Sequence, residues 1–431
     1  MLLRIPRLPL VPDPLHRIRV PSELEPITSI ADEAGPEPLG LPRETVERIW
    51  EAACDLYRSG VHPALTLCLR RHGRVVLDRA IGHARGNGPD DDPDGPKVPA
   101  TPETPFCVFS TSKAITAMVV HLLAERGALS IDDRVADYIP GYAAHGKGET
   151  TIGHVLSHRA GVPTLPSEVL ELDRVGDREF IRDAICGAKP FVKPGTLLAY
   201  HAVSGGFILD EVIERATGRG VRDVLNDEIL GPLGFRWGSY GVAEEDVPRV
   251  GLNYTTGPRL LPPASLLVKR VLGAPIEKVV EVSNDPRFLT AVLPSANVVT
   301  TANELSRFFE IFRAGGQLDG VRVMAPETIR FALTEQSRLE IDLSLLFPTR
   351  FAYGLMLGAK VLSLMGRDTD LAFGHLGLIN IMGWADPERG ISGGLITSGK
   401  ALVYPEVHRF YSLMQRIASE VPKVPASERP F

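Results

Sequence analysis

The sequence predicts a mixed α/β fold of the α+β type, in which an antiparallel sheet flanked by helices is interrupted by an inserted helical domain. Strand patterns gather near the two ends of the chain, at 64–80 and 351–398, whereas helix patterns fill the middle third. The 431 residues suffice for more than one lobe and a sizeable core. The expected division is a Pro-rich N-terminal arm at 1–41, a sheet domain at 42–109 and 290–431, and a mostly helical domain at 110–289.

The first regular elements are a helix and a hairpin. The helix at 43–57 starts directly after a proline, carries one apolar stripe and is followed by a helix-ending glycine. Strands at 64–70 and 74–80 flank a tight turn that contains a glycine, which favours a hairpin. A third strand is expected at 104–109. An acidic loop at 87–99 lies between the hairpin and this third strand. It lacks the closing Glu of a calcium-binding loop, so we expect a solvated surface loop.

The middle and the end of the chain follow the same reasoning. The segment 249–293 has several prolines and no clear periodicity, so we expect a lid or a pocket wall, placed as a lid-like segment at 249–289 within the helical domain. Apolar periodicity predicts helices at 151–158, 178–186, 204–217, 221–229, 303–313, 326–333 and 405–420. Strands are expected at 351–357, 379–385 and 393–398.

Composition excludes several classes of function. Charged residues make up 23% of the chain and the formal net charge is −6, without a basic stripe, so nucleic acid is not an expected partner. The N-terminal residues 1–12 are too broken by Pro and Arg for a signal peptide, and no apolar run reaches membrane-spanning length. We therefore expect a cytoplasmic protein without stable membrane insertion.

A serine and a lysine one helical turn apart stand at the centre of the chain. Ser110 follows an apolar run, and Lys113 begins a helix rich in Ala, Met, Val and Leu. If Ser110 opens that helix, Lys113 lies on the same face. A serine becomes a nucleophile when a base takes its proton, and a lysine can act as that base when burial or positive charge lowers its pKa. A helix that is apolar nearly all round is expected to be buried, and its N-terminal dipole is positive. The pair thus predicts an activated serine, although chance supplies about one such Ser-x-x-Lys per chain of this size.

Two later stretches join this pair. Tyr200 and His201 end the run PGTLLAYH, and His375 opens the run HLG that closes at Gly377. Their order and spacing resemble the serine β-lactamase and penicillin-binding-protein superfamily, closest to its class-C-like branch with the β-lactamase-like carboxylesterases, family VIII. The likeness runs from about residue 43 to 420. It includes LSHRAGVP at 156–163, GALSIDD at 127–133 and PSANVVTTA at 294–302.

The resemblance implies a β-lactamase/transpeptidase-like fold and an acyl-enzyme mechanism. Ser110 would attack the acyl carbon, and Lys113 and Tyr200 would move its proton as one coupled unit. The oxyanion hole would be the backbone N–H groups of Ser110 and Leu378. Gly377 would let the backbone come close to the substrate. No metal and no cofactor are expected, and the expected partner is a small-molecule ester.

Departures from the family pattern favour an esterase. The lactamases have Tyr-x-Asn, whereas Ala202 stands at the Asn position here; they have Lys-Thr-Gly, whereas His375 replaces the lysine. A neutral histidine holds the carboxylate of a β-lactam poorly. Both His201 and His375 are then expected near the substrate, His201 at the pocket rim and His375 at the HLG turn. The expected activity is cleavage of uncharged carboxylic esters.

Several alternatives stay open at this point. Tyr200 could be a core tyrosine and His375 a strand-end cap, while three further histidines favour structural roles: His154, His158 and His201. Cys107, inside the expected third strand, is a rival nucleophile, and a Ser-His-Asp triad is a rival mechanism that lacks a Gly-x-Ser-x-Gly turn. The rival functions are a β-lactamase or D-amino-acid peptidase, an acyltransferase of the same fold, and a non-catalytic binding protein. The sequence does not predict the oligomeric state.

Overall fold

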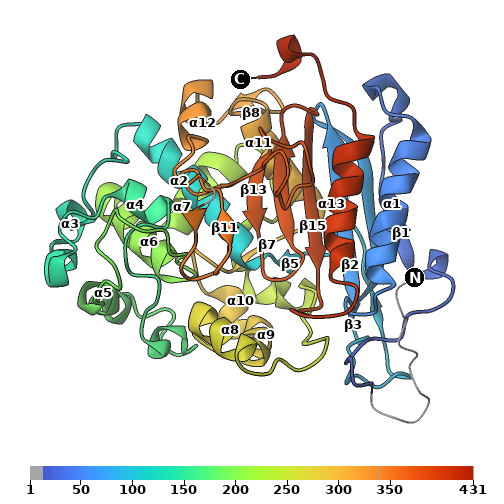
Figure 1. The fold of residues 1–431 in the computed structure, drawn as a ribbon, viewed down its shortest axis with the longest axis horizontal. Coiled ribbons are helices and arrows are strands. Elements are labelled where there is room, and N and C mark those ends of the chain that lie inside the picture. Colours follow the sequence, from blue (N-terminus) through green and yellow to red (C-terminus); the bar gives the residue numbers. More distant parts are fainter. Residues whose placement is uncertain (1–12, 339, 431) are drawn as a thin grey trace.

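The computed structural model describes residues 13–338 and 340–430, so the expectation for the N-terminal segment 1–12 lies outside the described residues. The chain forms three layers (Figure 1). Helices α1 (Arg43–Tyr57) and α13 (His408–Glu420) cover one face of the main sheet, and α11 (Ala302–Arg313) covers the other. A body of further helices lies beyond α11, on the left of the view. The α+β class predicted from the sequence is confirmed.

The main sheet is antiparallel and joins the two ends of the chain. Its central pair is β2 (Ala64–Arg71) next to β15 (Ile391–Thr397). The full order is β1 (Thr28–Ile30), β3 (Arg74–Arg85), β2, β15, β14 (Met382–Asp386), β13 (Phe373–Leu376) and β12 (Met356–Leu357), and β4 (Val98–Pro99) pairs with β3. The predicted hairpin of β2 and β3 is confirmed, and β1 shows that part of the N-terminal arm is a strand of this sheet.

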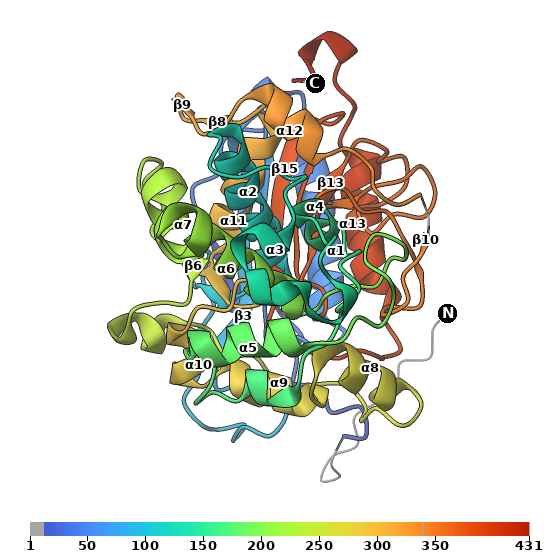
Figure 2. The ribbon, with the colours of Figure 1, turned by 90° about the vertical axis from the view of Figure 1, so that its left-hand side faces the viewer.

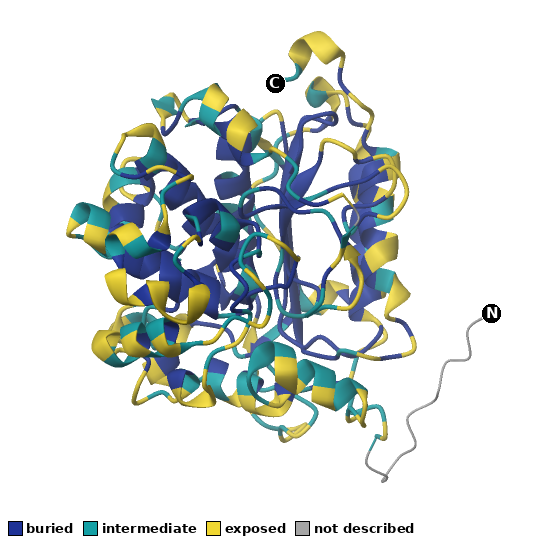
Figure 3. Cartoon of the chain, turned by 60° about the vertical axis from the view of Figure 1, so that its left-hand side comes forward, coloured by how far each residue is buried: buried dark blue, intermediate teal, exposed yellow. Residues whose placement is uncertain are grey.

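Both faces of the sheet are buried (Figure 3). Along β2, Leu65 and Leu67 belong to the core under α1 and α13, whereas Cys68 faces the core under α11. Glycines let α11 approach the strands closely: a Cβ at Gly394 would lie 2.3 Å from the carbonyl oxygen of Ala302. A side chain there would push the helix away from the sheet, and this explains why the strands near α11 are glycine-rich.

The helical body surrounds α2 (Ser112–Glu125), whose residues 112–123 are buried on every side, as its apolar sequence predicted. Around it pack α4 (Ile152–Leu156), α6 (Ser204–Thr217), α7 (Val221–Leu225) and α12 (Pro326–Ala332), with α3 (Val135–Tyr138) and α5 (Arg178–Gly187) farther out (Figure 2). Within the described residues, no helix has both the length and the apolar character that crossing a membrane requires.

Within residues 13–338 and 340–430, three small sheets lie outside the main one. The strand expected at 104–109 is only β5 (Phe106–Cys107), and it pairs with β7 (Val298–Thr300) instead of joining the main sheet. This pairing ties the segment before Ser110 to the PSANVVTTA stretch. The remaining strands are β6 (Ser239–Tyr240), paired with β7, β8 (Gln317–Leu318) with β9 (Val321–Arg322), and β10 (Glu340–Ile341) with β11 (Pro348–Thr349).

The segment 249–293 was expected to be irregular, and that expectation was wrong. It contains three short helices, α8 (Ala264–Leu272), α9 (Ile276–Ser283) and α10 (Pro286–Thr290). A proline stands immediately before α8 and α9 and is the first residue of α10, where its missing N–H costs nothing. Prolines that look like breakers in the sequence therefore mark helix starts.

The strands predicted near the C-terminus need a second correction. Residues 379–381 belong to a turn, because Ile379 and Asn380 have φ values of 53° and 57°, which end any strand. The missed strand is β13 (Phe373–Leu376), which carries His375 itself rather than following it. Of the strand expected at 351–357, only β12 forms at its end.

Candidate active site

Ser110 lies in a sharp turn between β5 and α2. The turn is one 3-10 segment, η3 (Phe109–Thr111), so the serine precedes the α-helix instead of opening it. Phe109 has φ of 47°, a left-handed conformation that L-residues other than Gly rarely adopt. The turn is held by the N–H of Val108, which donates to Val298 O at 2.9 Å, and by the N–H of Thr111, which donates to Val108 O at 3.2 Å. The strained turn presents the Ser110 side chain to a cavity.

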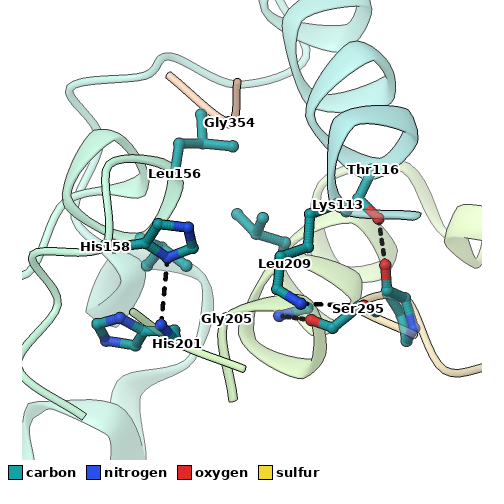
Figure 4. A pocket seen from close by; sticks show the side chains of 12 residues that line it. Lys113, Thr116, Leu156, His158, His201, Gly205, Leu209, Ser295 and Gly354 are labelled. Atoms are coloured by element: carbon teal, nitrogen blue, oxygen red, sulfur yellow. Dashed lines mark hydrogen bonds between the residues drawn. The ribbon is translucent and has the colours of Figure 1, made fainter. Parts of the chain in front are cut away.

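Lys113 reaches Ser110 and two backbone carbonyls. Its Nζ lies 3.3 Å from Ser110 Oγ and donates to Ala202 O at 2.7 Å and to Ser295 O at 3.0 Å. Figure 4 shows the lysine extended from α2 toward Ser295. None of these partners is a carboxylate, and burial lowers the pKa of Lys113 from 10.5 to about 7. A substantial fraction of this lysine is therefore neutral near pH 7 and can accept a proton.

Tyr200 completes the cluster around the serine. Its hydroxyl shares a hydrogen bond with the Ser110 side chain, and Lys113 Nζ lies 5.0 Å from the centre of its ring. The ring is packed against His158, with 4.7 Å between ring centres. Burial raises the pKa of Tyr200 above its usual value of 10, so the phenol is neutral. Tyr200 is thus a buried tyrosine that also contacts the serine.

His375 faces Tyr200 from β13, with 6.4 Å between the ring centres. Its Nδ1 lies 2.8 Å from Leu376 O and must donate to it, because a carbonyl only accepts. Its Nε2 is then an acceptor, and it is buried without a partner among the described residues. Burial, with a further contribution from Lys113, lowers the pKa of His375 to about 3, so the ring is neutral.

The HLG turn brings backbone close to the serine. A Cβ at Gly377 would lie 2.5 Å from Val108 O, so the turn can pass this close only with glycine there. The hydroxyl of Thr111 donates to His375 O at 3.2 Å and ties the turn to η3. Leu378, the next residue, lines the same cavity as Ser110.

Figure 4 shows His201 beside His158, across a small pocket that both histidines line with Lys113. His201 is absent from the described residues that line the larger Ser110 cavity. The Nε2 atom of His201 accepts a hydrogen bond from the backbone N–H of Val162 at 3.3 Å, and the backbone N–H of His201 donates to His158 Nδ1 at 3.3 Å. Burial lowers the pKa of His201 to about 4. These contacts place His201 among the structural histidines, away from the pocket rim where we expected it.

The rival nucleophile Cys107 is poorly suited to attack. Its thiol is buried and donates to Ala296 O at 3.3 Å. Burial raises the pKa of the thiol from 9.0 to about 12, so almost no thiolate exists near neutral pH. Across residues 13–338 and 340–430, no group of three or more His, Cys, Asp or Glu side chains is arranged to hold a metal ion.

Ser110 opens into a cavity of about 550 Å³. Its inner wall comes from the core, with Phe109, Leu293 and Leu378. Its outer walls are two segments, 167–175 and 272–288, and the second belongs to α8–α10. Part of the segment for which we expected a lid or a pocket wall thus lines this cavity. Charged side chains of these walls are exposed, whereas the apolar ones are buried or half-buried: Leu170, Leu172, Val175, Leu272, Val279, Val282 and Phe288.

Sequence reasoning missed Lys400, a second buried lysine beside the turn. Its Nζ lies 5.1 Å from the ring centre of Phe109 and donates to Thr397 O at 2.5 Å. Burial lowers its pKa from 10.5 to about 7. An isolated lysine in the sequence SGKAL looks like part of an exposed loop, and no periodicity signals that it is buried.

Comparisons with known proteins agree with this geometry. The Beta-lactamase family model matches residues 43–412. Esterase/beta-lactamase LipL of Mycobacterium tuberculosis is 29% identical over 311 residues, which are 67% of this chain and 68% of LipL. Penicillin-binding protein 4 of Amycolatopsis lactamdurans is 34% identical over 131 residues, covering 29% of this chain and 33% of that protein.

Solved structures share the fold over most of the chain. A penicillin-binding-protein homologue from Caulobacter crescentus has a TM-score of 0.74 at 24% identity, covering 91% of this chain and 100% of its own. A family VIII carboxylesterase has a TM-score of 0.74 at 24% identity, with 90% and 99% covered. EstA of Arthrobacter nitroguajacolicus Rue61a has a TM-score of 0.69 at 25% identity, with 87% and 97% covered.

Proposed function

The chain belongs to the Beta-lactamase family and is a serine hydrolase of the β-lactamase/esterase superfamily. From that premise we propose that it is a carboxylesterase that forms an acyl-enzyme on Ser110. One observation carries the proposal: Lys113 Nζ is buried 3.3 Å from Ser110 Oγ, and its hydrogen-bond partners in the described part of the chain include no carboxylate that would hold it in its charged form. A neutral amine at that distance is a base for the serine hydroxyl.

The proposed acylation uses three side chains. Lys113 takes the proton of Ser110 as Oγ attacks the ester carbon, and the negative oxygen is stabilised by the N–H groups of Ser110 and Leu378. Tyr200, which is a neutral phenol, gives its proton to the departing alkoxide. The Lys113 ammonium, 5.0 Å from the Tyr200 ring centre, stabilises the phenolate that results.

Deacylation restores every proton. The Tyr200 phenolate takes a proton from water as the water oxygen attacks the acyl carbon. The bond from the acyl carbon to Ser110 Oγ breaks, and Lys113 returns its proton to that oxygen. One ester and one water thus give one acid and one alcohol, and the three side chains end in their starting protonation states.

Uncharged esters fit the site better than β-lactams. The position where the family's lactamases have a lysine holds His375, which is neutral and cannot attract the carboxylate of a β-lactam. The inner cavity walls are apolar. LipL is named an esterase and the family VIII enzyme a carboxylesterase, and both names support a preference for esters. β-Lactam hydrolysis is the second candidate, because the name of LipL includes it as well.

Two substrates and one probe test the proposal. We expect turnover of p-nitrophenyl butyrate to exceed that of nitrocefin in kcat/KM, and a fluorophosphonate probe to label the wild-type protein. Ser110→Ala should abolish both turnover and labelling, whereas Ser419→Ala on the exposed side of α13 should change neither. No labelling of the wild type would overturn the enzyme assignment, and faster nitrocefin turnover would favour the lactamase.

Tyr200→Phe tests the proton path separately. Removal of a positioned acid typically costs about 10²- to 10⁴-fold in rate, so we expect a loss of that size for ethyl butyrate, whose ethoxide must be protonated as it leaves. An unchanged rate would show that Tyr200 does not protonate the leaving group, even with Ser110 as the nucleophile.

A further inference from the structure

We infer that His62 and Asn380 are positioning residues for the oxyanion hole: a buried hydrogen bond between their side chains fixes the turn that carries the N–H of Leu378. The inference rests on the proposed function, in which that N–H stabilises the negative oxygen formed when Ser110 attacks an ester. It adds two residues that lie outside the HLG run and take no part in the proton transfers.

The backbone N–H of Leu378 is free to bind a substrate oxygen. It donates to no acceptor within residues 13–338 and 340–430, and Leu378 lines the cavity into which Ser110 opens. The preceding N–H, on Gly377, is used inside the turn and donates to Ile381 O at 2.8 Å. A donor stabilises an oxyanion best when it already points at the place where the charge develops. The conformation of the turn at 377–381 therefore decides how well this N–H can serve.

The turn has a conformation that its residues do not favour by themselves. Ile379 and Asn380 have φ values of 53° and 57°, and a β-branched residue such as Ile379 rarely adopts the left-handed region. Two such residues in a row persist only when surrounding groups hold them in place. The hydroxyl of Thr397 is one such group, because it lies 3.0 Å from Ile379 O and 3.3 Å from Asn380 O and can donate to either.

The Asn380 side chain is the second group that holds the turn. Its Nδ2 donates to His62 Nε2 at 3.1 Å and to the hydroxyl of Tyr404 at 2.8 Å. The His62 side chain is fully buried, and its Nδ1 lies 3.2 Å from Gly399 O, to which it must donate because a carbonyl only accepts. Nε2 is then the acceptor that the amide requires. Burial, with a further contribution from Lys400, lowers the pKa of His62 to about 3, so the ring stays neutral near pH 7.

These contacts tie the turn to the centre of the main sheet. His62 stands just before β2, and Gly399 and Tyr404 follow β15, the strand that pairs with β2. The network touches neither the serine nor its proton carriers, so it acts only on where the Leu378 N–H points. Loss of the bond between His62 and Asn380 should therefore slow the chemical step and leave ester binding nearly unchanged.

Three variants test the assignment with ethyl butyrate as the substrate. His62→Phe keeps a buried ring without an acceptor, and Asn380→Gly removes the amide but suits the left-handed turn. Loss of a whole oxyanion donor costs about 10²- to 10³-fold in kcat, so we expect a misdirected donor to cost about tenfold or more in both variants. KM should stay within about twofold. His62→Gln, whose amide oxygen can accept in place of Nε2, should recover most of kcat.

His121→Phe is the matched control. His121 is also buried, and its Nε2 lies 3.0 Å from the carbonyl oxygen of Tyr353, far along α2 from the turn. The substitution removes a buried histidine and a bond to a backbone carbonyl, as His62→Phe does, and it should leave kcat unchanged. Urea unfolding of all variants measures their stability, and Asn380→Gly provides the result if His62→Phe does not fold.

A transition-state analogue gives a readout that a general loss of structure would not give. When propyl trifluoromethyl ketone binds, Ser110 Oγ adds to the carbonyl carbon, the carbonyl oxygen becomes an oxyanion, and the hydroxyl proton passes to Lys113. The inhibition constant of this ketone should rise in His62→Phe and Asn380→Gly by about the same factor by which kcat/KM falls.

The outcomes separate this inference from the proposed function. Three results with an active wild type would overturn the inference alone: unchanged kcat in both variants, a loss that appears in KM with no change in the inhibition constant, or His62→Gln as slow as His62→Phe. A loss in His121→Phe equal to that in His62→Phe would do the same. No hydrolysis of any ester by the wild type, with no fluorophosphonate labelling, would overturn the esterase proposal and this inference with it.

Discussion

Lys113 and Lys400 are two buried lysines next to the strained turn at Phe109. Lys113 contacts Ser110, and Lys400 lies over the ring of Phe109. Lys113 donates to two backbone carbonyls and Lys400 to that of Thr397, and burial lowers the pKa of each lysine to about 7. A lysine that is held by carbonyl dipoles in a dry site gives up its proton far more readily than one that is held by a carboxylate. The turn thus lies beside two lysines that can change charge near neutral pH.

The first prediction concerns the pH dependence of the proposed reaction. Lys113 is a base only when neutral, and its pKa of about 7 makes it neutral above that pH. We expect kcat/KM for p-nitrophenyl butyrate to rise with pH through about 7 and then level off. Lys113→Arg should abolish activity, because a guanidinium does not lose its proton. The exposed Lys193→Arg is the control. A profile that is flat across pH 7 would contradict the role of Lys113.

The second prediction concerns stability. The pKa of Lys400 is about 7 in the folded protein and about 10.4 in an unfolded chain. Between these values the unfolded chain binds more protons, so the contribution of Lys400 to the unfolding free energy rises with pH from about 7 to about 10. Lys400→Met removes the group. The free energy of unfolding of Lys400→Met minus that of the wild type should therefore be largest at pH 6 and should decrease toward pH 10.

Urea unfolding of both proteins at several pH values measures this difference. Lys269→Met, an exposed change on α8, should give a difference that does not vary with pH. A constant difference for Lys400→Met would mean that Lys400 keeps its proton in the folded state.

At the level of single residues, the sequence could predict the Ser110–Lys113 pair, because helical spacing brings them to one face. Tyr200 and the HLG turn come from distant parts of the chain, and only the family resemblance indicated that they meet at the serine. Neither a local spacing pattern nor the family resemblance indicated that Lys400 lies near the serine. Burial of a lone polar side chain depends on the tertiary packing around it, which local sequence does not contain.

At the level of elements, the two outer walls of the cavity touch each other. Gly273 ends α8 in a left-handed conformation with φ of 81°, and a Cβ there would lie 2.7 Å from Leu170 Cδ1 on the opposite wall. An ion pair between Asp173 and Arg287, 2.8 Å apart, also joins the walls. That pair is exposed to solvent and contributes little, so the packing at Gly273 matters more for the shape of the cavity.

The third prediction uses this glycine. Gly273→Ala should cost about 1 kcal/mol of unfolding free energy, because alanine disfavours the left-handed conformation, and it should also displace Leu170. Gly218→Ala is a matched control: Gly218 ends α6 with φ of 71°, and a Cβ there would have nothing within 4 Å. Both variants should lose similar stability in urea unfolding. Only Gly273→Ala should change the relative kcat/KM of p-nitrophenyl esters with acyl chains of different length, and equal profiles for the two would show that this contact does not shape the cavity.

The elements that the sequence predicted well are long and periodic, such as α1, α2, α6 and the β2–β3 hairpin. The failures have local causes. Prolines before or at the start of α8, α9 and α10 look like helix breakers in the sequence, and the four residues of β13 include Gly and His, which do not favour strands. Tertiary contacts decide such segments. The cavity walls and the strand that carries His375 were therefore the parts of the site that sequence patterns described least well.

At the level of the whole molecule, one apolar core runs through both expected domains. Ala64 and Cys68 of β2, Phe309 of α11, Met118 of α2 and Ile208 of α6 belong to the same buried cluster. The pairing of β2 with β15 and the packing of α1 beside α13 also close the chain on itself. A core shared in this way couples the unfolding of the sheet to that of the helical body.

The fourth prediction is that the two regions unfold together. The chain has three tryptophans; Trp384 lies in β14 of the main sheet, and Trp237 stands next to β6 beside the helical body. In single-tryptophan variants, fluorescence from either one should give the same urea midpoint. Leu413→Ala on α13, which empties a fully buried site, should cost about 2–5 kcal/mol and shift both midpoints together. If only the Trp384 transition moved, the helical body would be an independent folding unit, and the turn that carries Ser110 would join two domains rather than lie within one.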